Sequence, residues 1–73
     1  MYKEITCQNI TYSNHKIVAI ESLESDEGQE ELTVFSATIL DSNGNFVTYR
    51  KGLNLDEAID KCKIYINNHG ITN

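Results

Sequence analysis

The chain has 73 residues, a net charge of −5 and 40% apolar residues, with no Trp and no Pro. This length allows one small domain, residues 1–73, and excludes two. The apolar content is too high for a wholly disordered chain, and no apolar run approaches the roughly 18 residues that span a bilayer. A domain of this size buries only about 60% of its unfolded surface, so its core is small.

The N-terminal segment, residues 2–12, predicts a first strand. Ile5, Cys7 and Ile10 are its candidates for facing a core. Residues 13–15, Ser-Asn-His, then predict a turn because short polar residues tolerate turn conformations.

Three further strands are predicted before the helix. Residues 16–23 carry a run of Ile, Val and Ala, and the polar segment 24–31 that follows predicts a loop. Residues 32–40 and 46–50 are rich in β-branched and aromatic side chains. The Asn43-Gly44 pair between them predicts a type I′ hairpin turn.

A helix is predicted over residues 55–69, since apolar residues recur there at helical spacing. Asn54 is a suitable N-cap, and Glu57 three residues later completes a capping box. His69 falls in the last turn, and Gly70 is suited to closing the helix. The apolar face consists of Leu55, Ala58, Ile59, Cys62, Tyr65 and Ile66.

These elements predict an α+β fold, β-β-β-β-α, with an antiparallel three- to four-stranded meander and one C-terminal helix packed on one face of it. Both central strands are apolar on both sides, whereas one helix can cover only one side. In the third strand, residues 35, 37 and 39 share one face and residues 32, 34 and 40 share the other.

The uncovered face is therefore expected to keep apolar surface, supplied in part by some of the aromatic residues Tyr2, Tyr12, Phe46 and Tyr49. A large exposed apolar patch is typical of an interface, which favours a homodimer through this open face or through a sheet edge. The alternative is a solvated face with scattered apolar residues.

The net negative charge of the chain comes from one hairpin. Residues 21–41 hold seven acidic residues and no Lys or Arg, so the rest of the chain carries +2. Such a loop either keeps a small protein soluble or docks on a basic partner surface. Its candidate partner-binding residues are Glu24, Asp26, Glu27, Glu30 and Glu31.

A second candidate surface joins Tyr49, Arg50 and Lys51, with Lys61 and Lys63 extending it into one basic strip. Aromatic and basic side chains on a sheet are a means of binding single-stranded nucleic acid. Because the chain is acidic as a whole, nucleic acid is the least favoured partner.

Catalytic and metal motifs are missing from the sequence, so we expect no enzyme, no cofactor and no metal site. The two cysteines, Cys7 and Cys62, are expected to be reduced thiols. Met1-Tyr2-Lys3-Glu4 lacks the pattern of a signal peptide. The expected location is therefore the cytoplasm, without membrane attachment.

Residues 43–59 place a strand, a short link and a Leu-Asp-Glu-Ala-Ile helix start in succession. This order resembles, in outline, small antitoxin domains of the HicB type and other small bacterial strand–helix modules. The Pro-Gly segment typical of the HicB-type sheet is absent, so no residue or function is carried over from the resemblance.

The sequence as a whole predicts a small, non-catalytic protein-binding module, most readily a homodimer. The alternatives are an acidic inhibitor or antitoxin-like protein acting on a basic partner, and a weak binder of single-stranded nucleic acid.

Overall fold

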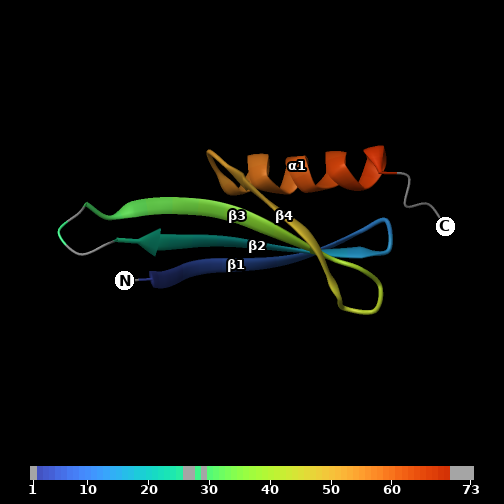
Figure 1. The fold of residues 1–73 in the computed structure, drawn as a ribbon, viewed down its shortest axis with the longest axis horizontal. Coiled ribbons are helices and arrows are strands. Elements are labelled where there is room, and N and C mark those ends of the chain that lie inside the picture. Colours follow the sequence, from blue (N-terminus) through green and yellow to red (C-terminus); the bar gives the residue numbers. More distant parts are fainter. Residues whose placement is uncertain (1, 26–27, 29, 70–73) are drawn as a thin grey trace.

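The computed structural model describes residues 2–25, 28 and 30–69, with Tyr2 described by its backbone alone. A four-stranded antiparallel sheet, in the order β1-β2-β3-β4, lies against a single helix. Figure 1 shows the helix as a second layer over the sheet. The predicted α+β meander is thereby confirmed. The elements are β1 Tyr2–Tyr12, β2 His15–Glu24, β3 Leu32–Leu40, β4 Phe46–Gly52 and α1 Leu55–Asn68.

The β1–β2 turn is the tightest in the chain. Tyr12 pairs with His15, and the two residues between them have positive φ angles, 51° for Ser13 and 64° for Asn14. Two central residues with positive φ define a type I′ turn, whose twist matches that of the flanking strands. Neither residue is Gly, so the turn holds side chains in a region that L-residues rarely adopt.

The β3–β4 turn differs from the prediction of a type I′ turn at Asn43-Gly44. The Gly44 N–H donates to the Asp41 carbonyl at 2.9 Å, and Gly44 alone has a positive φ, 85°. The Asp41 carboxylate accepts from the N–H groups of Asn43 and Asn45, both at 2.9 Å. This side chain fixes a three-residue loop with Gly in the left-handed position, the next most common hairpin connection.

The ends of α1 follow the predicted capping pattern. Asn54 Oδ1 accepts from the Glu57 N–H at 2.8 Å, and Glu57 Oε1 accepts from the Leu53 N–H at 3.0 Å. The helix ends at Asn68, one residue before the predicted end, and His69 is the C-cap, whose N–H donates to Tyr65 O. The predicted closing residue, Gly70, lies outside the described residues.

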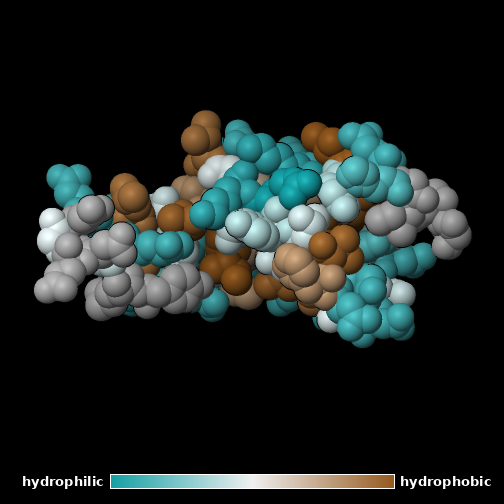
Figure 2. Space-filling model, in the orientation of Figure 1, coloured by the Kyte–Doolittle hydropathy of each residue, from teal (hydrophilic) through white to brown (hydrophobic). Residues whose placement is uncertain are grey.

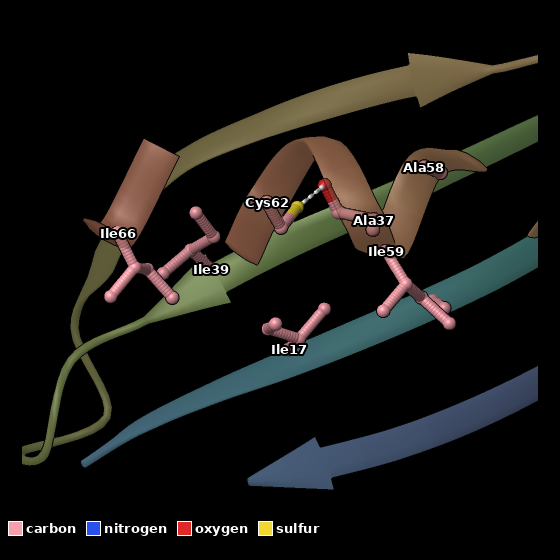
Figure 3. Close-up of a cluster of buried hydrophobic side chains, with 8 residues drawn as sticks. Ile17, Ala37, Ile39, Ala58, Ile59, Cys62 and Ile66 are labelled. Carbon is pink, nitrogen blue, oxygen red and sulfur yellow. Dashed lines mark hydrogen bonds between the residues drawn. The ribbon is translucent and has the colours of Figure 1, made fainter. Parts of the chain in front are cut away.

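The core lies between α1 and the middle of the sheet (Figure 3). Small side chains on both layers, such as Ala37 and Ala58, bring the helix close enough for the Cys62 thiol to donate to the Ala37 carbonyl at 3.5 Å. The predicted apolar helix face is confirmed. The buried cluster consists of Ile17, Ala19, Ala37, Ile39, Ala58, Ile59, Cys62 and Ile66.

Predictions for β1 hold only in part. Ile10 packs against the core, but Ile5 is 47% exposed and Cys7 is exposed. Ile5 lies at a bulge, since the register with β2 shifts between Glu4 and Thr6. Beyond such an extra residue, alternation no longer predicts which face a side chain takes.

The sheet is longer than the helix that covers it. β4 ends at Gly52, which pairs with Phe35, so residues 32–34 of β3 have no neighbour on that side. Together with residues 22–24 of β2, which also pair with residues 2–4 of β1, they form an arm that extends past the start of α1 (Figure 1). The molecule measures 48 × 21 × 16 Å.

Candidate functional site

The sheet face turned away from α1, hereafter the open face, is defined by strand register. Ile17, Ala19, Ala37 and Ile39 are buried toward the helix, so their chain neighbours point the other way. Its apolar members are Val18, Ile20, Leu32, Val34, Leu40, Phe46 and Tyr49.

Several of these apolar side chains are well exposed. Leu32 and Phe46 are each 64% exposed and Tyr49 is 51% exposed, while Val18, Ile20, Val34 and Leu40 are half-buried. In the view of Figure 2, hydrophobic groups lie along the sheet layer below the helix, interspersed with polar ones. The predicted apolar surplus on this face is present.

One aromatic candidate belongs to the other face. Tyr12 pairs with His15 at the end of the hairpin and packs against the core, and its hydroxyl donates to Asn67 Oδ1 of α1 at 3.1 Å. Tyr12 is therefore not one of the aromatic residues that supply the open face, because the two-residue turn sets the strand phase that places it under the helix, whereas Phe46 and Tyr49 do lie on that face. The side chain of Tyr2, another candidate, lies outside the described part.

Charges on the open face are separated along the strands. Lys16 lies at the turn end of β2, whereas Glu24 lies at its far end, on the arm. Glu4 is next to Ser22 on the same acidic end. Lys16 and Glu24 are exposed, and neither has an ion-pair partner in the described part of the chain. Lys51, beside Ser36, is the fourth charged side chain on this face.

The acidic loop begins at the tip of the arm. Glu24, Glu30 and Glu31 are exposed, as expected of a solvated loop or a docking element. Asp26 and Glu27, the remaining predicted contact residues there, lie outside the described residues. No side-chain geometry is therefore assigned to the loop as a whole.

The predicted basic strip is divided by the fold. Tyr49 and Lys51 point to the open face, but Arg50 between them points to the helix side. Lys61 Nζ donates to the Lys51 carbonyl at 3.0 Å, whereas Lys63 Nζ lies 5.4 Å from the Tyr12 ring on the opposite flank of α1. Alternation along a strand places consecutive side chains on opposite faces, so one strip cannot form.

Arg50 instead belongs to a cleft of about 300 Å³ between β4 and α1. Its guanidinium lies 4.9 Å over the Tyr65 ring and donates to Thr48 Oγ1 at 3.0 Å and to Tyr49 O at 2.7 Å. The His69 ring meets Tyr65 edge-on at 3.9 Å. These contacts close the flank of the helix, and sequence reasoning missed the one between Arg50 and Tyr65 because it joins two elements 15 positions apart.

A second cleft, of about 250 Å³, lies between the two hairpin turns and includes His15, Lys16 and Asp41. The pKa of Asp41 is lowered chiefly by the hydrogen bond from the Asn45 N–H, with smaller lowering contributions from Asn43 and the charge of His15. His15 is buried, and its Nδ1 lies 2.7 Å from Ser13 O. The polar groups of this cleft thus stabilise the two turns.

The two thiols have different environments. Cys62 is buried, and this burial raises its pKa against a smaller lowering by Arg50. Cys7 is exposed on β1, on the open face. No pair of thiols in the described chain forms a disulfide.

No cluster of three or more His, Cys, Asp or Glu side chains that could hold a metal ion occurs in residues 2–25, 28 and 30–69. Within the same residues, α1 is too short and too polar to cross a bilayer.

The open face therefore carries three of the large apolar side chains that the described part of the chain exposes, Leu32, Phe46 and Tyr49. Comparison with protein-family models, curated proteins and solved structures found no match for this chain.

Proposed function

We propose that this chain is a small, non-catalytic, cytoplasmic protein-binding module that works as a homodimer through its open face. The observation that carries the proposal is the exposure of Leu32, Phe46 and Tyr49 on the face opposite α1. Leu32 lies at one end of this face and Phe46 at the other, with half-buried apolar side chains between them, and exposed apolar surface of this kind is typical of an interface. An antiparallel sheet covered by a second sheet forms a standard sandwich.

Sedimentation equilibrium over a range of protein concentrations tests the proposal. We expect dimers in the micromolar range, and we expect Ile20→Lys to shift the protein to monomer because Ile20 lies near the centre of the open face. Gln8→Lys is the matched control, since Gln8 is exposed on the opposite face of β1. If the wild-type protein sediments as a monomer at about 100 μM, the proposal is rejected.

A second candidate function rests on the acidic loop. Glu24, Glu30 and Glu31 are exposed together near the arm, and they supply the charge that an acidic inhibitor or antitoxin-like protein would present to a basic partner. Replacing Glu30 and Glu31 by Lys should abolish capture of such a partner while leaving the dimer intact. Retention of the same partner by this variant would exclude the loop.

Single-stranded nucleic acid has the least support of the three. Tyr49 and Arg50 point to opposite faces, and Arg50 is already engaged with Tyr65. An aromatic platform with adjoining cations is therefore not assembled at the residues predicted for it.

A further inference from the structure

We infer that two copies of this chain stack through their open faces. The twofold axis runs along the row that contains Ile20 and Ser36, so the strands of the two copies run in opposite directions. This inference rests on the proposed homodimer and adds its alignment. Ile20 and Ser36 are direct cross-strand partners, so they form one row across the sheet. The charges on the two sides of this row are opposite in sign.

An axis along this row places each strand over the same strand of the partner and reverses its direction. Residues equally far before and after the row then face each other. On β2, Lys16 lies four residues before Ile20 and Glu24 lies four residues after it. Each Lys16 therefore faces the partner's Glu24, and the dimer contains two such ion pairs.

Two of the apolar contacts match under the same operation, whereas Val18 would face the partner's Ser22 and Val34 the partner's Thr38. On β3, Leu40 lies four residues from Ser36 in one direction and Leu32 lies four residues from it in the other. Leu40 therefore faces the partner's Leu32, so the dimer covers a side chain that is 64% exposed in one copy. At the centre, Ile20 meets the partner's Ile20.

The other face-to-face twofold arrangement fits poorly. An axis parallel to the strands would place β2 over the partner's β3 without reversing direction. Lys16 would then face the partner's Leu40, and Glu24 would face the partner's Leu32. Each charge would lose water without gaining a counter-charge, which costs free energy. The separation of charge along β2 therefore favours the inverted alignment.

One like-charge contact remains in the inverted dimer. Lys51 lies on the central row, beside Ser36, and would face the partner's Lys51. β4 is an edge strand, so water and salt screen this pair. Lys51→Gln should therefore strengthen the dimer modestly.

The area of the open face indicates the protein concentration at which dimers should form. Strands about 4.8 Å apart and same-face residues about 6.8 Å apart give an area of roughly 500–600 Å² per copy, below the roughly 800 Å² per partner of a standard interface. A dissociation constant in the micromolar range is expected, within reach of sedimentation and of titration calorimetry by dilution.

Charge reversal tests the alignment. Lys16→Glu and Glu24→Lys should each weaken dimerisation about three- to tenfold, because each leaves two like-charge contacts per dimer. The double variant should return to the wild-type dissociation constant. Lys3→Glu is the matched control, since Lys3 pairs with Leu23 and points to the opposite face. Circular dichroism of each variant establishes that it remains folded.

Cross-linking gives an independent measurement. Cys7 pairs with Ile20 and so lies on the central row of β1, where it faces the partner's Cys7. A short bismaleimide should join two chains of Cys62→Ser but not of Cys7→Ser. If the wild-type protein is dimeric, but the double variant does not regain the wild-type dissociation constant and no Cys7 cross-link forms, the alignment is wrong. The proposed homodimer would still stand. A monomeric wild-type protein would remove both.

Discussion

Cys7 and Cys62 have the same side chain in contrasting surroundings. Thiolates are the reactive form, so burial that raises the pKa of Cys62 suppresses its reaction. We expect Cys7 to react with a maleimide within minutes in dilute protein, and Cys62 to react only as fast as the domain opens. Mass spectrometry of the labelled protein over time distinguishes the two sites. Equal rates at both cysteines would show that the core around Cys62 is open to solvent.

Asp41 links pH to the stability of one turn. Its folded-state pKa lies below the ordinary value of 3.8, chiefly because the Asn45 N–H donates to it. A group with a lowered pKa adds stability above its unfolded pKa and loses it as the pH falls through the folded value. The wild-type melting temperature should therefore fall on acidification below about pH 4.

The matched variant for this effect is Asp41→Asn. Asparagine keeps an oxygen that can accept from Asn43 and Asn45 but does not titrate. Between pH 7 and about pH 2.5, its melting temperature should fall less than that of the wild type. The other carboxyl groups are common to both proteins, so equal falls would exclude Asp41 as a contributor.

At the scale of single elements, the β1–β2 turn is a place where the sequence is not optimal. Ser13 and Asn14 both have positive φ, which is unfavourable for a residue with a Cβ. The double substitution Ser13→Asn, Asn14→Gly installs the preferred type I′ pair. It should stabilise the domain by about 0.5–1 kcal/mol, measured by urea denaturation. A loss of stability would contradict the assigned turn.

Gly52 connects the last strand to the helix at close range. A Cβ there would lie 2.7 Å from the Ala58 backbone nitrogen and 3.0 Å from Glu57 Cβ. Backbone cannot move aside as a flexible side chain can, so Gly52→Ala should destabilise the domain by about 1–3 kcal/mol. Leu53→Ala is the control, because Leu53 is 82% exposed. Similar denaturation midpoints for the two variants would show that α1 yields to the added methyl group.

The elements themselves could be predicted because their signals are local. Helical spacing, the cap at Asn54 and the polar composition after β2 depend on near neighbours. The structure has the helix over Leu55–Asn68 and the cap at Asn54, and Glu30 and Glu31 of the predicted loop are exposed. The apolar surplus of the open face followed from alternation alone. The position of Tyr12 depended on the length of a turn that composition does not specify.

Three features of the structure differ from the prediction. The β3–β4 turn changed type because the Asp41 carboxylate captures two backbone N–H groups. Arg50 left the expected basic strip because strand phase turns it toward Tyr65. Ile5 is outside the expected core because Ile10 takes the helix side of β1, which leaves the odd-numbered residues Cys7 and Ile5 without a place under the helix. The turn type depends on side-chain contacts two and four residues away, and alternation alone divides the strip, whereas the face that each strand turns to the helix depends on pairing register.

At the scale of the whole molecule, dimerisation should couple to stability. Anything that binds the folded state alone raises the melting temperature by mass action, so a second copy makes stability depend on concentration. We expect the wild-type melting temperature to rise as the protein concentration is raised from about 5 to about 200 μM. Circular dichroism in cells of different path length measures it. The Ile20→Lys variant should show no such rise.

The arm of residues 22–24 and 32–34 is the part of the sheet that a partner copy would stabilise most. In one copy this arm extends past its own helix (Figure 1), and a segment with few packed neighbours opens readily to solvent. In the proposed inverted dimer this arm would lie against the helix-supported end of the partner's sheet, so each copy would stabilise the arm of the other. Amide hydrogen exchange in the arm should then slow as concentration rises, while exchange around Ala37 and Ile39 changes little.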